Sequence, residues 1–155
     1  MENTSTTVCL VGVGNPIRSD DGLGPYICSL VDTLKIPGVS TMQLHQLHTD
    51  IIEDLFSYDH IVVVDASVEG EDVAFYAPER DKTAAVASSH HMNVAMLDAL
   101  AHTVYKKQLS FRVCAVRGEN FAMGDQLTAA AKRNAAAAVT MITEWVGSLS
   151  STNVE

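Results

Sequence analysis

The chain has 155 residues, 47% of them hydrophobic and 19% charged, and carries a net charge of −9. This length suits one domain with a substantial core and is short for two. The acidic balance argues against a nucleic-acid partner, because phosphate backbones are bound mainly by clustered Lys and Arg. No apolar run approaches the roughly 20 residues that span a bilayer, so no membrane partner is expected.

Strands and amphipathic helices alternate along the whole chain, which predicts an α/β domain with a mostly parallel sheet. We expect a single domain over residues 1–155, with frayed ends at about 1–6 and 150–155. The predicted strands are 8–15, 39–47, 60–67, a shorter one within 72–79, and 109–116. The predicted helices are 22–35, 49–57, 93–107 and 125–149.

Helical spacing of the apolar residues predicts which faces of these helices point inward. The predicted inward residues are Ile27, Leu30, Val31 and Leu34 in the first long helix, Val94, Leu97, Leu100, Ala101 and Val104 in the third helix, and Leu127, Ala130, Ala131, Asn134, Ala138, Met141, Ile142 and Trp145 in the last.

The stretch VCLVGVGNPIRSDDGLG, residues 8–24, joins the first strand to the first helix. A dinucleotide-binding G-x-G-x-x-G pattern starting at Gly12 fails, because Ile17 stands where the last glycine is needed. The adjacent Asp20 and Asp21 would also repel a phosphate. Each carboxylate is either a helix cap or a ligand-binding group at the carboxyl end of a strand, where open α/β sheets bind ligands.

A third carboxylate, Asp65, ends the apolar run IVVVD. It is either a turn cap for Ser67 and Val68 or a site residue. If the first and third strands are neighbours, Asp21 and Asp65 emerge at the same edge of the sheet.

Histidines offer nitrogen donors to the same edge. The pair His90 and His91 follows a polar, irregular segment, and such a pair is either a solvated surface feature or a source of metal ligands. Two carboxylates and an imidazole suit a divalent transition metal that keeps open positions for water or substrate. His45 and His48 are possible further donors or supporting groups. The remaining histidines, His60 and His102, are interpreted as structural or exposed.

The three cysteines, Cys9, Cys28 and Cys114, lie far apart inside apolar segments. This placement predicts buried free thiols rather than disulfides or a thiolate metal site, and a catalytic thiol is the weaker alternative. The polar opening MENTSTT lacks the basic and apolar regions of a signal peptide, which predicts a cytoplasmic protein.

Three motifs in order, GVGNPIRSDDGLG, HIVVVDAS and SSHHMN, resemble those of the hydrogenase maturation endopeptidases. These enzymes trim the C-terminal tail of the large subunit of a nickel-iron hydrogenase, and the resemblance covers nearly the whole chain. It implies a three-layer fold, phosphorylase/hydrolase-like, with a twisted sheet of about five strands flanked by helices. A further likeness, in HQL, SHH and VRGENFAMG, is to the branch that serves cytoplasmic, cofactor-linked hydrogenases.

The resemblance also implies site residues. The family binds its metal through an acidic residue, an Asp and a His, which match Asp21, Asp65 and His90, with His91 as the alternative to His90. The expected metal is Ni²⁺ carried by the substrate precursor, and another divalent cation could replace it in a crystal. The same three residues are the expected catalytic residues, with Asp21 or Asp65 as the base.

The expected function is therefore metal-dependent removal of the C-terminal extension of a nickel-iron hydrogenase large-subunit precursor after nickel insertion. No Ser-His-Asp or H-E-x-x-H pattern is present to cleave the peptide bond in a conventional way. One alternative is a non-catalytic nickel-binding maturation chaperone that uses the same ligands. A less favoured alternative is a peptidyl-tRNA hydrolase-like esterase, which shares a GxGNP turn but needs an early histidine and a basic surface that this chain lacks.

Overall fold

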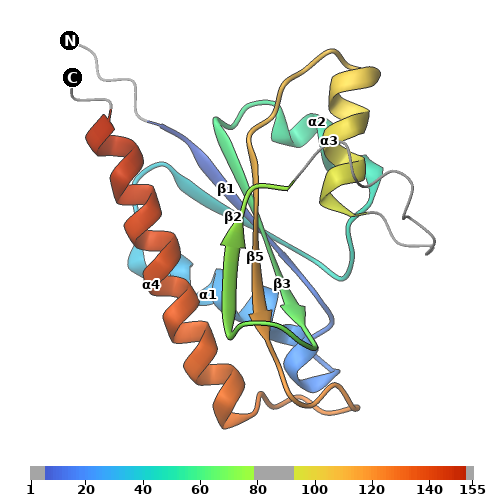
Figure 1. Ribbon diagram of the computed structural model, residues 1–155, viewed down its shortest axis with the longest axis vertical. Helices are drawn as coiled ribbons and strands as arrows, with labels where there is room; N and C mark the ends of the chain where they lie inside the picture. Colours follow the sequence, from blue (N-terminus) through green and yellow to red (C-terminus); the bar gives the residue numbers. More distant parts are fainter. Residues whose placement is uncertain (1–5, 79–92, 153–155) are drawn as a thin grey trace.

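The computed structural model describes residues 6–78 and 93–152. Its strands are β1 (Val8–Val13), β2 (Val39–Leu44), β3 (His60–Ser67), β4 (Val73–Tyr76) and β5 (Phe111–Arg117). They form one sheet in the order β2-β1-β3-β5-β4 (Figure 1). All neighbouring pairs are parallel except β4 and β5, which pair antiparallel at one edge. The prediction of a mostly parallel sheet of about five strands is confirmed.

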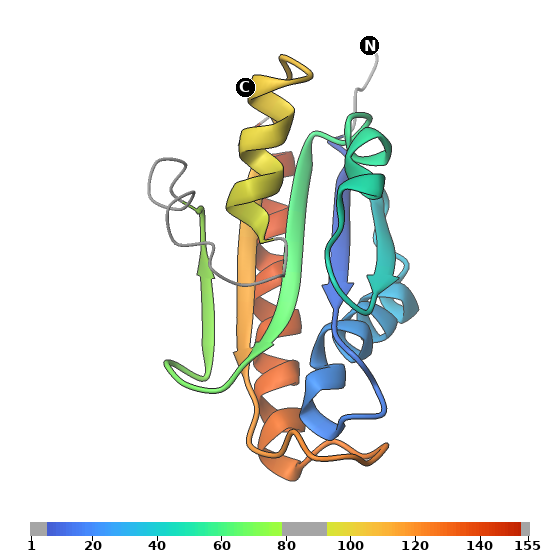
Figure 2. The same ribbon diagram turned by 90° about the vertical axis from the view of Figure 1, so that its right-hand side faces the viewer.

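Helices cover both faces of this sheet. Among the described residues they are α1 (Leu23–Leu34), α2 (Ile52–Leu55), α3 (Val94–Thr103) and α4 (Ala129–Thr152), with 3-10 turns η1 (Ser19–Gly22) and η2 (Thr49–Ile51). α1 and α4 pack on one face, and α2 and α3 on the other (Figures 1 and 2). The predicted three-layer α/β architecture is therefore confirmed. No helix in the described part of the chain is both long and apolar enough to cross a membrane.

The alternation of side chains along β1 supplies both halves of the core. Val8 and Leu10 pack toward α1 and α4, whereas Cys9 and Val11 pack toward α2 and α3. All four are at most 1% exposed. Burying one such side chain contributes about 1.5–3 kcal/mol. Because the strand interiors are filled on both faces, polar chemistry is left to the strand ends and their loops.

Two glycines let α1 lie directly on the strands. A Cβ atom on Gly24 would come within 2.5 Å of the backbone N and O of Val13 and of the Val64 carbonyl, and one on Gly12 would meet the Gly24 carbonyl at the same distance. Only glycine permits this approach. The start of α1, and the turn before it, are consequently held against the carboxyl ends of β1 and β3.

Several predicted boundaries and faces were wrong, mostly at the ends of elements; within α4, Met141 was predicted to point inward but is 37% exposed. Leu34 is 50% exposed and Val104 is 62% exposed, because each stands at the C-terminal end of its helix, where the neighbouring layer does not cover it. The last helix begins at Ala129 and not near 125, since the Thr128 hydroxyl caps it by accepting the Ala131 N–H at 3.1 Å. That helix continues to Thr152.

Candidate functional site

The turn between β1 and α1 places Asp21 at the carboxyl end of β1. One Asp21 oxygen (Oδ2) accepts the Asn15 N–H at 2.8 Å, and the Asn15 side chain accepts the Ile17 N–H at 3.1 Å. Gly14 has φ of +146°, a conformation that L side chains rarely adopt, so glycine suits this position. Asp21 therefore has a fixed orientation, with part of its carboxylate left accessible.

The adjacent Asp20 points into the protein and is fully buried. Its carboxylate accepts the backbone N–H groups of Glu119 (2.7 Å), Asn120 (3.1 Å) and Thr128 (2.8 Å), and the Thr128 hydroxyl at 2.8 Å. Burial by itself would raise the pKa of Asp20, but these donors outweigh it and hold the pKa below its ordinary value. Asp20 thus ties the first loop to the loop after β5.

The alternative that Asp20 and Asp21 cap a helix is not observed. Both lie within η1, and the start of α1 at Gly22 carries no side-chain capping bond. One carboxylate instead holds a distant loop and the other faces a pocket.

Asp65 is brought beside the first turn by strand pairing. In the parallel ladder of β1 and β3, Asp65 pairs with Val13, as expected if the two strands are neighbours. Its Oδ1 accepts the N–H of Ala66 at 2.8 Å, so it does not cap Ser67 or Val68. Burial raises the pKa of Asp65 to about 6, the Ala66 N–H opposes this rise, and the charge of Asp21 adds to it. A carboxyl with this pKa exchanges a proton near neutral pH.

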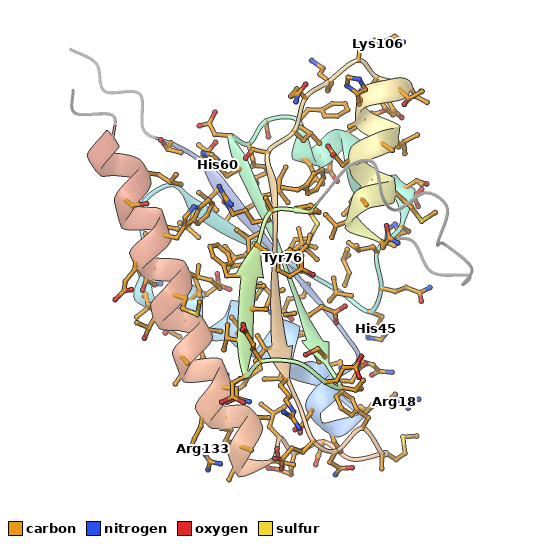
Figure 3. All side chains as sticks on the ribbon, in the orientation of Figure 1. Arg18, His45, His60, Tyr76, Lys106 and Arg133 are labelled. Atoms are coloured by element: carbon orange, nitrogen blue, oxygen red, sulfur yellow. The ribbon has the colours of Figure 1, made fainter. Side chains whose placement is uncertain are left out.

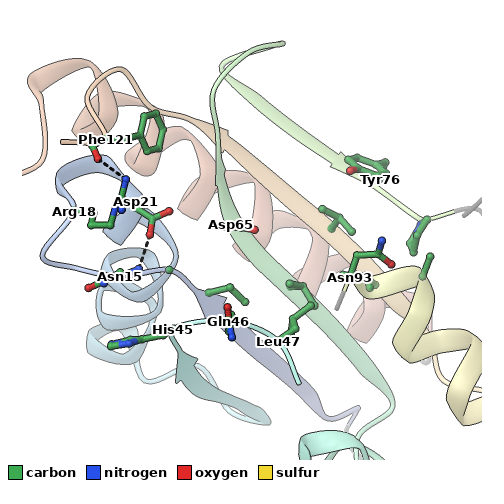
Figure 4. Close-up of a pocket in the computed structure, with 17 residues that line it drawn as sticks. Asn15, Arg18, Asp21, His45, Gln46, Leu47, Asp65, Tyr76, Asn93 and Phe121 are labelled. Atoms are coloured by element: carbon green, nitrogen blue, oxygen red, sulfur yellow. Dashed lines mark hydrogen bonds between the residues drawn. The ribbon is translucent and has the colours of Figure 1, made fainter. Parts of the chain in front are cut away.

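Asp21 and Asp65 line one open pocket of about 1030 Å³ (Figure 4). His45 lies on the same wall, as the sequence had suggested for a further donor, whereas His48 is half exposed and lies 3.9 Å from Asp50 outside the pocket lining. The lining is Val13, Gly14, Asn15, Arg18, Asp21, His45, Gln46, Leu47, Val63, Asp65, Tyr76, Pro78, Asn93, Val94, Ala95, Val113 and Phe121.

Four polar or aromatic lining residues were not singled out from the sequence: Arg18, Tyr76, Asn93 and Phe121. Arg18 Nη2 donates to the Phe121 carbonyl at 3.2 Å, which joins two loops about a hundred residues apart in the chain. Sequence spacing contains no signal for that contact. Asn93 caps α3 by accepting the Met96 N–H at 2.9 Å, a pattern that its place before an apolar periodic run does indicate.

The third expected ligand, His90, and its alternative His91 lie outside the described residues. Within residues 6–78 and 93–152, no group of three His, Cys, Asp or Glu side chains is placed to hold a metal ion. Asp21 and Asp65 therefore supply an incomplete set of oxygen donors.

The cysteines offer no nucleophile to this pocket. Cys9, Cys28 and Cys114 are all buried free thiols, as predicted. Burial raises the pKa of Cys9 to about 11 and those of Cys28 and Cys114 to about 12. Because the thiolate is the reactive form, thiols with such pKa values are inert at neutral pH. His60, which was interpreted from the sequence as structural or exposed, is half-buried, with its Nδ1 3.0 Å from the Ser110 hydroxyl.

The architecture defines a class: a three-layer α/β protein with paired carboxylates in a pocket at the carboxyl ends of β1 and β3. No protein-family model matches the chain, and no curated protein matches it either. Solved structures do match over most of its length, and they include hydrogenase maturation proteases.

The chain is similar to the nickel-iron hydrogenase maturation protease HycI from Thermococcus kodakarensis, with a TM-score of 0.73 and 17% identity over 92% of this chain and 93% of that one. It is also similar to a hydrogenase 2 maturation peptidase from a Thaumarchaeota archaeon (TM-score 0.67, 19% identity, 92% and 99% covered). A third match is the endopeptidase HybD from Escherichia coli (TM-score 0.66, 17% identity, 88% and 90% covered). This chain has the fold of hydrogenase maturation proteases.

Proposed function

We propose that this protein is a metal-dependent endopeptidase that removes the C-terminal extension of a nickel-iron hydrogenase large-subunit precursor after nickel insertion. The observation that carries the proposal is the convergence of Asp21 and Asp65 on one pocket, close enough for the charge of one to raise the pKa of the other. The fold shared with hydrogenase maturation proteases supports it.

The donor chemistry of the pocket fits a cation that arrives with the substrate. Asp21 and Asp65 offer carboxylate oxygens, and the described residues hold no complete metal cluster. His90 is proposed as the nitrogen ligand, and Asn93, three residues further along the sequence, lines the pocket. When bound, the nickel of the precursor supplies Lewis-acid polarisation of the scissile carbonyl or of a water molecule.

The remaining roles belong to the chain itself. The Asn15 N–H holds Asp21 in a fixed orientation, so that its carboxylate need not be ordered when a cation binds. The apolar side chains of Leu47, Val63 and Val113 also line the pocket and limit the access of water. Only a precursor that carries its metal completes this site, which gives the selectivity for loaded substrate. We further propose that the protein acts in the cytoplasm, where it meets the precursor.

The test is incubation of the purified protein with nickel-loaded and nickel-free forms of the precursor, followed by the intact mass of the large subunit. We expect tail removal from the loaded form alone. His90→Ala is expected to abolish it and His91→Ala to preserve it, with His102→Ala on the exposed side of α3 as the matched control. Equal trimming of both precursor forms would contradict the metal requirement. Tight binding of the loaded form without cleavage would favour the maturation-chaperone alternative.

A further inference from the structure

Two loops far apart in the chain are joined into one body beside the pocket. Residues 15–19 and 119–124 form this body, which we call the two-loop platform. Its cross-links are Ser19 N–H to the Gly124 carbonyl (2.8 Å), Gly124 N–H to the Ile17 carbonyl (2.9 Å), Ser19 Oγ to the Ala122 carbonyl (2.7 Å) and Arg18 Nη2 to the Phe121 carbonyl (3.2 Å).

The platform is also anchored from beneath. Asp20 follows its first loop directly, and the carboxylate of Asp20 accepts the N–H groups of Glu119 and Asn120 in the second loop. The Asp20 N–H in turn donates to the Asn120 carbonyl at 2.8 Å. Such dense backbone pairing fixes the shape of the platform before any partner arrives, and a preformed surface avoids the ordering cost of binding.

This rigid body exposes two large apolar side chains. Ile17 is 54% exposed and Met123 is 77% exposed. Gly124, the residue after Met123, donates its N–H to the Ile17 carbonyl. The backbones of Ile17 and Met123 therefore lie close together. A single exposed apolar residue needs no explanation, whereas exposed apolar residues that gather on one surface mark places where other proteins bind.

The platform is continuous with the candidate active site. Arg18 and Phe121 belong to the platform and also line the pocket that contains Asp21 and Asp65 (Figure 4). A chain whose tail enters this pocket remains attached to a folded body, and that body must lie over the rim. The side of the rim formed by Ile17 and Met123 is preorganised and apolar.

We infer that the two-loop platform is the docking surface for the folded body of the precursor, which contacts Ile17 and Met123 through an apolar patch while its tail occupies the pocket. This inference rests on the proposed function. It assigns affinity for the precursor to the platform and leaves bond cleavage to the carboxylates of the pocket.

The experiment compares two double variants that make the same kind of change at different places on the surface. Ile17→Ser with Met123→Ser alters the platform, and Leu34→Ser with Val104→Ser alters two other exposed apolar residues, on α1 and at the end of α3. Val104 lies two residues before Lys106, and Figure 3 shows Lys106 and Arg18 at opposite ends of the molecule. Thermal unfolding of both variants checks that the fold is retained.

For processing of the nickel-loaded precursor, the platform variant is expected to raise KM at least about tenfold with kcat unchanged, because apolar contacts made equally in substrate and transition state affect binding alone. The Leu34 and Val104 variant is expected to keep the wild-type KM. If the wild type binds without cleaving, the same comparison is made on Kd by calorimetry. A platform variant within twofold of wild type overturns the docking surface alone, whereas a wild type that neither binds nor cleaves the precursor overturns the proposed function with it.

Discussion

The two sides of the first loop put identical side chains to opposite uses. On the inner side, Asp20 is fully buried and accepts hydrogen bonds from four donors in the loop after β5. On the pocket side, Asp21 accepts the N–H of Asn15 and lies with Asp65 at the wall of a cavity. The difference shows that a carboxylate with all its acceptor sites filled by the protein stabilises structure, while one left partly unfilled can bind a ligand.

The largest effect is expected from Asp21→Ala, which removes the member of the pair that faces the pocket. Processing of the loaded precursor should fall at least about a hundredfold, since one of the carboxylates proposed to bind the metal of the precursor is lost. Stability should change by only about 1 kcal/mol, the net value of one hydrogen bond. The measurement is the rate of tail removal together with urea unfolding, and Asp54→Ala on the exposed side of α2 is the control. Normal processing by Asp21→Ala would remove this residue from the site.

Asp20→Ala should show the opposite pattern to Asp21→Ala, because its main effect is expected on stability. Four donors lose their buried acceptor, and we expect about 3–5 kcal/mol of destabilisation in urea unfolding at pH 7. Thr128→Val, which removes only the hydroxyl donor and the cap of α4, should cost about 1–2 kcal/mol.

The pH dependence sharpens the assignment of Asp20. The pKa of Asp20 is lower in the folded protein than in the unfolded chain. Its contribution to stability is therefore fully present at pH values above the unfolded-state pKa, and it is lost as the pH falls through the folded-state pKa. The difference between wild type and Asp20→Ala should therefore shrink in strong acid. A difference that stays constant down to pH 2 would contradict the role of the ionised carboxylate.

The sheet and its layers could be predicted from the sequence because they follow from local patterns. The run from Ile61 to Val64 fits a strand buried on both faces, and pairing of β1 with β3 follows from short crossovers. The ends of helices could not be predicted in the same way. The start of α4 depends on Thr128, whose N–H and hydroxyl are both bound by a carboxylate 108 residues away in the chain.

The site was predictable to the extent that strand ends define it. Asp21 and Asp65 could be placed at this edge of the sheet because each comes after an apolar run, but the different roles of Asp20 and Asp21 could not be distinguished from two adjacent identical residues. The contribution of Arg18 and Phe121 to the pocket depends on a tertiary contact between two loops. The role of His90 stays a prediction.

The smallest effect in this comparison is a gain of stability on neutralising Asp65. Its pKa rises from 3.8 to about 6 on folding, through burial first and then the charge of Asp21, against the opposing Ala66 N–H. The folded protein thus holds this proton more tightly than the unfolded chain, so stability falls as pH rises from about 4 to about 6 and then levels off.

Asn in place of Asp stays uncharged and can still accept the Ala66 N–H. Asp65→Asn should therefore match wild type near pH 4 and exceed it by about 1–2 kcal/mol at pH 7, while processing is lost. Urea unfolding at intervals from pH 4 to pH 8 measures this difference. Asp21→Asn removes the neighbouring charge. The fall in stability that accompanies ionisation of Asp65 should then occur at lower pH than in the wild type, nearer the ordinary pKa of an aspartic acid. If the Asp65→Asn and wild-type curves coincide across the whole range, the carboxyl is ionised at no cost and the coupling of the two pocket carboxylates is wrong.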